Sequence, residues 1–279
     1  MRTVYSHQRP GLDLFLFVTT VTFARRAAEA GVTSLVIDWE NPAKHARQRG
    51  YDTPTNRHTV AQLDEVVKSV AIPVTVRINA LPGGEAEMET ALDYGARILM
   101  LPMARSAREV EKFVKRVRGR AKTVVQIETL ELVADCANLK TVPWDYAYIG
   151  LNNLMAARAG NWLWEPLCDG TLDGVCGQLA GRQLGFGGIT IVGGGEPLRF
   201  TDLLREYDRL GCTFSFLHRT FQREIGDRDL GSELRAVQGA WAATTQRGPI
   251  AVQQDQQDFR ARFDLLRAEM LNRRLVTVG

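Results

Sequence analysis

The chain has 279 residues, 45% of them hydrophobic, which is enough to bury a large core in a single domain. Its 35 basic and 32 acidic residues are interspersed, and the resulting formal net charge of +3 argues against a nucleic-acid partner. No apolar run is long enough to cross a membrane, and residues 1–10 contain no apolar signal segment, so the sequence predicts a cytoplasmic protein with no membrane partner.

Apolar runs of strand length alternate with segments of helical period along the chain. The runs that we predict as strands are 13–18, 34–40, 73–79, 96–102, 123–128, 146–151, 188–193 and 213–218. A helical pattern follows each run except the sixth, which precedes a longer irregular stretch. Continuous apolar strands are typical of a parallel sheet that is covered on both faces. The pattern predicts an α/β fold, a (β/α)8 TIM barrel over residues 1–248. An open doubly wound sheet is the alternative, but no G-x-G-x-x-G motif follows the first run.

Residues 249–279 lie beyond the eighth unit and are predicted to form an extra C-terminal helix. Phe259, Phe263, Leu266 and Met270 recur there at helical spacing. Four such side chains would cost on the order of 1.5 to 3 kcal/mol each if water surrounded them. This apolar stripe therefore needs a surface to cover it, either on the barrel's own outer helices or on another subunit.

Polar residues gather at the C-terminal ends of the predicted strands. In chain order they are Asp38, Glu40, Arg77, Asn79, Gln126, Glu128, Thr129, Gly150, Asn152 and Asn153. In a parallel barrel the residues at these ends surround one cavity, so the set is a candidate catalytic mouth. A helix cap or a surface ion pair is the alternative for any one of them taken alone.

The chemistry of these residues favours a carbon–carbon bond reaction. The carboxylate of Glu128 is a hard oxygen ligand of the kind that Mg²⁺ or Mn²⁺ prefers, and a 2-oxo acid could chelate the same ion. An arginine nearby would face the developing enolate oxygen, where a fixed cation and a Lewis acid both lower the cost of negative charge. The set therefore predicts cleavage or formation of a bond next to an oxo group.

Five short motifs occur in a familiar order: VIDWE at 36–40, VRIN at 76–79, Gly95-Ala96 with MLP ending at Pro102, QIET at 126–129 and IGLNNL at 149–154. On these motifs the chain resembles the HpcH/HpaI aldolase and citrate lyase β-subunit family over roughly residues 12–220. The resemblance implies a divalent-metal-dependent lyase or aldolase acting on a small 2-oxo acid, or running the related condensation.

The resemblance also implies roles for single residues. Glu128 and Asn153 stand where the family holds Mg²⁺ or Mn²⁺, and Arg77 stands where an arginine contacts the oxo acid or acyl group. Asp38 and Glu40 would orient metal-bound water or the arginine, and we assign Gly150 and Asn152 to substrate binding. Similar barrels exchange C-terminal helices, which implies a homo-oligomer joined through residues 249–279.

Two positions depart from the family pattern. Asn153 replaces the second metal-binding aspartate, which weakens the expected metal site, and Asn41 replaces a histidine base. A citrate-lyase-like enzyme acting on an acyl-CoA thioester therefore remains an alternative. A barrel that binds a small acid without catalysis, having lost its metal, is a further one.

The remaining candidates carry structural alternatives. His218 and Arg219 follow the last strand and either bind a substrate anion or form an ion pair. Lys44, His45 and Arg47 lie in the long loop 41–57 and either reach the mouth or stay solvated. The glycine-rich stretch 185–198 either binds an anion through its amides or forms tight turns, and Trp162 and Trp164 are either buried anchors or ligand platforms.

Overall fold

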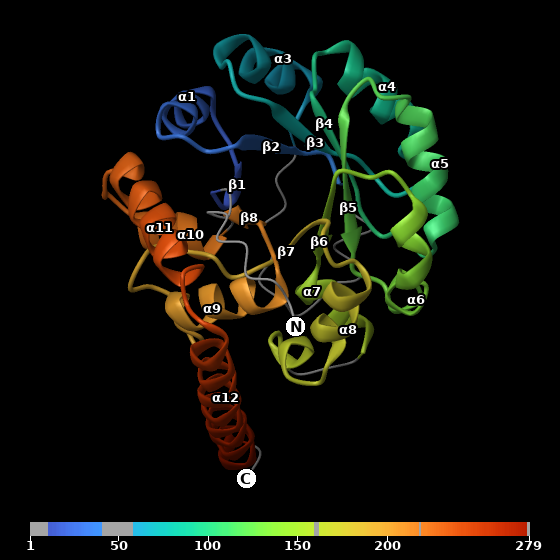
Figure 1. Cartoon of the computed structure of the whole chain (residues 1–279). Coiled ribbons are helices and arrows are strands. Elements are labelled where there is room, and N and C mark those ends of the chain that lie inside the picture. Colours follow the sequence, from blue (N-terminus) through green and yellow to red (C-terminus); the bar gives the residue numbers. More distant parts are fainter. Residues whose placement is uncertain (1–10, 41–57, 159–161, 218, 278–279) are drawn as a thin grey trace.

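The eight parallel strands of a barrel form the centre of the molecule. The structure is a computed structural model that describes residues 11–40, 58–158, 162–217 and 219–277 (Figure 1). The strands are β1 Asp13–Phe17, β2 Ser34–Asp38, β3 Val74–Arg77, β4 Ile98–Leu101, β5 Lys122–Ile127, β6 Tyr146–Ile149, β7 Gln183–Phe186 and β8 Phe214–Leu217. Their order in the sheet is β7-β6-β5-β4-β3-β2-β1-β8. The Thr213 amide donates to the Leu184 carbonyl at 2.8 Å and joins the two ends of this order, so the barrel is nearly closed. The predicted TIM barrel is confirmed.

Helices cover the outside of the barrel (Figure 1). Those between consecutive strands are α1 Val21–Glu29, α3 Val60–Ser69, α4 Glu85–Asp93, α5 Ala107–Val117, α6 Leu130–Ala134, α7 Leu151–Ala157, α8 Thr171–Gln178 and α9 Phe200–Leu210, with short turns of 3₁₀ helix at Cys136–Thr141 and Glu165–Leu167. After β8 come α10 Arg219–Ile225, α11 Leu230–Thr244 and α12 Pro249–Thr277. Their starts follow local sequence rules: Thr59 and Gln62 form a capping box on α3, and Ser106 caps α5.

The position predicted for the seventh strand is wrong. The run 188–193 is a loop in the structure, and β7 is the preceding segment Gln183–Phe186, which pairs with β6 through Tyr146 and Gln183. Gly188 at φ 112° and Gly193 at φ 86° take backbone conformations that a strand does not allow. Ile189 is still buried, so its apolar character marks a packed loop and not a strand.

Aromatic residues fill the interior of the barrel. The inner cluster comprises Phe15, Phe17, Val36, Ile98, Met100, Val124, Tyr146, Phe214 and Phe216. Several rings meet edge to face, as Phe15 and Tyr146 do at 5.2 Å between centroids. Side chains two residues apart on a strand share a face, so Asp38 follows Val36, and Gln126 and Glu128 follow Val124, on the inside of the barrel. The packed interior therefore ends in polar residues at the C-terminal rim.

The last helix, α12, packs on its own chain. Phe259 and Phe263 are buried, and the ring of Phe263 stacks on Trp162 with 4.0 Å between centroids. Arg247, which precedes the helix, pairs with Asp208 of α9 at 3.0 Å. Leu266 of the predicted stripe is also packed, partly buried, against the core, and the helix then extends away from the barrel (Figure 1).

Candidate functional site

An arginine held by two carboxylates lies at the C-terminal rim of the barrel. Asp38 ends β2 and Arg77 ends β3, and the register of the two strands places them side by side. The Nε and Nη2 groups of Arg77 donate to the two oxygens of Asp38 at 2.8 and 2.5 Å, and Nη1 lies 3.2 Å from Glu40 Oε2. The three residues are at most 7% exposed, so the guanidinium has a fixed orientation.

The charge of Arg77 is secure despite its burial. Burial by itself lowers the pKa of Arg77, but the charges of Asp38 and Glu40 outweigh burial and hold this pKa above its ordinary value. The N–H groups of Arg77 that do not face these carboxylates are available to an anionic group in the mouth. A permanent cation of fixed orientation suits the recognition of a carboxylate or an enolate oxygen.

A histidine, His58, supports the backbone of Asp38. The Asp38 amide donates to His58 Nδ1 at 3.0 Å, and His58 Nε2 lies 2.6 Å from the Val18 carbonyl oxygen. Both ring nitrogens are therefore engaged with the backbone of neighbouring strands. His58 positions the end of β2 and is not a candidate base.

Glu128 lies on the same rim, directly after β5. Its Oε1 accepts from the Met103 amide at 3.0 Å, and its Oε2 accepts from Asn153 Nδ2 at 2.6 Å. Met103 has φ 55°, an uncommon conformation for this residue type that turns its amide toward the carboxylate. A Cβ atom on Gly150 would lie 2.5 Å from Glu128 Oε2, so only glycine leaves room for this carboxylate.

The carboxylate of Glu128 is buried without a paired cation. Burial first, and then the charge of Glu40, raises the pKa of Glu128, while hydrogen bonds from Asn153 and Met103 and the charge of Arg77 act in the opposite direction. Within the described segments of the chain, Glu128 forms no ion pair. A buried carboxylate with a destabilised charge is a natural ligand for an added cation.

Glu128 and Asn153 together could hold a divalent ion, but only weakly. In the described part of the chain, no three His, Cys, Asp or Glu residues form a metal cluster. Glu128 supplies one carboxylate, and Asn153 could add a carbonyl oxygen if its amide rotated, because its nitrogen now faces Glu128. Mg²⁺ requires few protein ligands, since it keeps several waters and takes oxygens from its substrate.

The structure brings most of the predicted site residues together. Asp38, Glu40, Arg77, Glu128, Gly150 and Asn153 meet at one rim. Asn152 is exposed on the first turn of α7, and of these two asparagines it is Asn153 that contacts Glu128. His218, Asn41, Lys44, His45 and Arg47 lie outside the described residues, as does the side chain of Arg219.

Other polar candidates have structural roles. Asn79 is held by Glu87 of α4, whose carboxylate accepts from both its amide and its side chain, and Thr129 caps α6. In the glycine-rich stretch the Gly195 amide donates to the carboxylate of Glu224, which occupies the position open to an anion. Trp162 and Trp164 are buried anchors. The cysteines at 136, 168, 176 and 212 form no disulfide.

Sequence reasoning missed two groups in the mouth. The Met103 amide contacts Glu128, but a backbone group gives no signal in the sequence. Tyr148 of β6 lies near Glu128, which together with burial raises the pKa of its hydroxyl. Its position two residues after the interior Tyr146 was the available signal, because strand residues two apart share a face.

Solved structures share this fold, although sequence comparison finds no relatives. The sequence matches no model of a known family and no curated protein. An HpcH/HpaI aldolase/citrate lyase family protein from Burkholderia cenocepacia J2315 superposes with a TM-score of 0.58 at 17% identity, over 82% of this chain and 93% of that one. The citrate lyase β subunit complexed with oxaloacetate and magnesium from M. tuberculosis gives 0.57 at 17% identity, over 84% and 98%. The citrate synthase SbnG gives 0.58 at 15% identity, over 81% and 92%.

Proposed function

We propose that this chain, whose fold is that of HpcH/HpaI aldolases and citrate lyase β subunits, is a divalent-metal-dependent carbon–carbon lyase or aldolase. Its substrate would be a small 2-oxo acid, or the enzyme would run the related condensation. The observation that carries the proposal is the buried Arg77 guanidinium, clamped by Asp38 and Glu40 on the rim that also holds Glu128.

Glu128 and Asn153 are the proposed holders of Mg²⁺ or Mn²⁺. The carboxylate of Glu128 is buried and forms no ion pair with the described residues, which supports this assignment, and magnesium is present in the M. tuberculosis citrate lyase β subunit of the same fold. The bound ion would supply Lewis acidity, which polarises a 2-oxo group and lowers the cost of enolate charge. Gly150 contributes no side chain to the site, and the absence of a Cβ atom leaves room for the carboxylate of Glu128.

Arg77 is the proposed catalytic residue. Its remaining N–H groups would donate to the oxygen that becomes negative as the carbon–carbon bond breaks. Asp38 and Glu40 fix the plane of its guanidinium, so no reorientation is needed during the reaction. Asn152, His218 and Arg219 remain proposed contacts for the distal end of the substrate.

Two alternatives predict different substrates or none. A citrate-lyase-like enzyme would act on an acyl-CoA thioester, which the fold shared with citrate lyase β subunits favours. A non-catalytic barrel would bind a small acid without converting it, which the replacement of an aspartate by Asn153 favours. The buried guanidinium on the same rim as Glu128 favours catalysis over simple binding, because binding alone needs no clamped cation.

The decisive experiment follows proton exchange at the methyl group of pyruvate in D₂O by NMR, with and without Mn²⁺. We expect metal-dependent exchange in the wild type and a rate lowered by about a hundredfold in Arg77→Lys, because lysine lacks the planar fork. Arg116→Lys on α5 is the matched control, since Arg116 is exposed and distant in the fold from the rim. Circular dichroism checks that each variant is folded.

Each alternative has its own outcome. Exchange in acetyl-CoA but not in pyruvate would replace the 2-oxo acid with a thioester substrate. Binding of pyruvate without exchange under any metal would contradict catalysis. If Arg77→Lys does not fold, Glu128→Gln provides the second variant, and retention of Mn²⁺-dependent exchange in it would overturn the metal assignment.

A further inference from the structure

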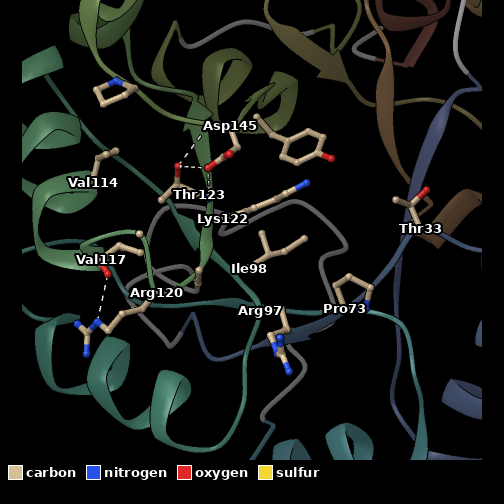
Figure 2. A pocket seen from close by; sticks show the side chains of 14 residues that line it. Thr33, Pro73, Arg97, Ile98, Val114, Val117, Arg120, Lys122, Thr123 and Asp145 are labelled. Carbon is tan, nitrogen blue, oxygen red and sulfur yellow. Dashed lines mark hydrogen bonds between the residues drawn. The ribbon is translucent and has the colours of Figure 1, made fainter.

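A cavity of about 640 Å³ lies at the opposite end of the barrel from the proposed catalytic rim (Figure 2). Its lining comes from the starts of the strands: Thr33 precedes β2, Pro73 precedes β3, Arg97 precedes β4, and Lys122 and Tyr146 begin β5 and β6. The end of α5 closes one side. This volume is within the range of pockets that hold small molecules.

The cavity combines cations with an apolar wall. Arg97, Arg120 and Lys122 line it, and Figure 2 shows Ile98 between Arg97 and Lys122. Val114, Val117, Pro73, Pro143 and the ring of Tyr146 provide further apolar surface. A ligand complementary to this lining carries negative charge on one part and an apolar body on another.

Two of these cations are uncommitted. Arg120 donates to both carboxylate oxygens of Glu89, at 2.7 and 3.0 Å. Arg97 and Lys122 are exposed on adjacent strands, where the Lys122 amide donates to the Arg97 carbonyl at 3.0 Å. Across the described segments, neither of their side chains pairs with a carboxylate. Lys122 Nζ lies 5.8 Å from the centre of the Tyr146 ring, at the edge of the apolar wall.

The acid in the lining is already engaged. Asp145 Oδ2 accepts from both the amide and the hydroxyl of Thr123, at 2.8 and 3.0 Å. The Tyr146 hydroxyl is likewise directed to Asp13, at 3.1 Å. The charged donors left for a ligand are therefore Arg97 and Lys122, and the negative charge of Asp145, which its neutral partners do not remove, partly offsets them.

We propose that this cavity binds a phosphomonoester with an apolar body, held by Arg97 and Lys122 through the phosphate and by the apolar wall through the body. The site is independent of the proposed catalysis, because it lies at the other end of the strands. A dianionic phosphate is an acceptor that forms charge-assisted hydrogen bonds with arginine and with lysine. The aliphatic and aromatic lining then distinguishes an organic phosphate from the inorganic ion.

Titration calorimetry with phenyl phosphate tests the site on the full chain. We expect saturable binding of one molecule, with inorganic phosphate and phthalate binding about tenfold more weakly or worse. The double variant Arg97→Gln/Lys122→Gln should lose affinity by about tenfold or more, since charge-assisted hydrogen bonds are removed.

The matched control is Lys112→Gln/Lys115→Gln, which removes the same charge from exposed positions of α5 outside the cavity. We expect its affinity to stay within about twofold of the wild type, because screening reduces distant charges. An equal loss in both double variants would show a diffuse basic surface and overturn the proposal. So would equal affinity for phthalate, which would indicate that the site does not distinguish a phosphate from two carboxylates on an aromatic ring. An absence of saturable binding would overturn the proposal as well.

Discussion

At the residue scale, Asn153 decides how strongly the rim can hold a metal. Its side-chain nitrogen donates to Glu128, and this neutral contact is compatible with a carboxylate that forms no ion pair within the described residues. An aspartate at this position would place a second negative charge against Glu128. The asparagine therefore stabilises the metal-free form and reduces the affinity for a divalent ion.

We expect Asn153→Asp to bind Mn²⁺ about tenfold more tightly than the wild type, because the substitution adds a second carboxylate ligand. The same change should lower the melting temperature of the metal-free protein, since a partly buried carboxylate at position 153 would repel the buried carboxylate of Glu128, and Mn²⁺ should restore it. Titration calorimetry and thermal melts measure both effects.

The matched control for this prediction is Asn152→Asp. It adds the same charge at the neighbouring exposed position, which does not contact Glu128. Equal Mn²⁺ affinity in the wild type and in Asn153→Asp would contradict the assignment of position 153 as a ligand. An equal gain in Mn²⁺ affinity in both variants would mean that the added negative charge attracts the ion without coordinating it at position 153.

The sequence could predict the side chains of this site but not its backbone contacts. Asp38, Arg77 and Glu128 follow apolar strands, and the ends of parallel strands meet at one rim, so their proximity was predictable. The Met103 amide and the space that Gly150 leaves depend on where one loop packs against another chain segment. Such contacts carry no signature in residue type.

At the element scale, strands were predictable where polar residues separate one apolar run from the next. The seventh strand was displaced because a second apolar run, with Ile189 and Ile191, follows it closely and is buried as well. Both segments satisfy the hydrophobic pattern, and only the positive φ of Gly188 excludes the second from the sheet. Periodicity detects burial, and a buried loop satisfies it as a strand does.

Helix α9 carries a buried ion pair whose stability should depend on pH. Arg209 Nη2 lies 2.6 Å from Glu206 Oε2, and Arg209 Nη1 also reaches Asp173. Burial raises the pKa of Glu206, while Arg209 acts in the opposite direction. Removing the arginine leaves this carboxylate buried without its main partner.

We expect Arg209→Met to lower the free energy of unfolding at neutral pH by about 3 kcal/mol. The folded-state pKa of Glu206 is raised, so keeping this carboxylate ionised in the folded protein costs stability. That cost is absent below the ordinary pKa of glutamate, where the group is protonated in both states, and it grows as the pH rises through the raised value. The difference between variant and wild type should therefore shrink toward acidic pH. Urea unfolding at several pH values measures it.

The double variant Glu206→Gln/Arg209→Met is the control for this pair. It removes the buried charge together with its partner, so it should recover much of the lost stability and remove the pH dependence that Glu206 adds. A loss for Arg209→Met that stays constant with pH would mean that Glu206 does not carry the effect.

At the scale of the whole molecule, α12 begins on the barrel and ends beyond it (Figure 1). Phe259 and Phe263 are buried and Leu266 packs partly buried against the core, which supports the alternative that the chain covers its own stripe. Leu265, which is not part of the stripe, is 68% exposed, and the helix continues to Thr277. An apolar partner for the distal part would have to come from elsewhere, and the predicted homo-oligomer concerns this part alone.

Deleting residues 267–279 separates folding from assembly. The truncated chain keeps Phe259 and Phe263 on the barrel. Among the contacts of the described side chains, it loses an exposed ion pair between Arg267 and Glu165, so its melting temperature should stay close to that of the full chain if assembly adds little to it. Its mass by light scattering should fall toward that of a monomer at concentrations where the full chain is an oligomer.

Phe263→Ala is the complementary variant, and it should cost about 3 kcal/mol in stability because it removes the ring stacked on Trp162. A full-length chain that is monomeric at every concentration would contradict the assembly, because the end of α12 would then be stable without a partner subunit.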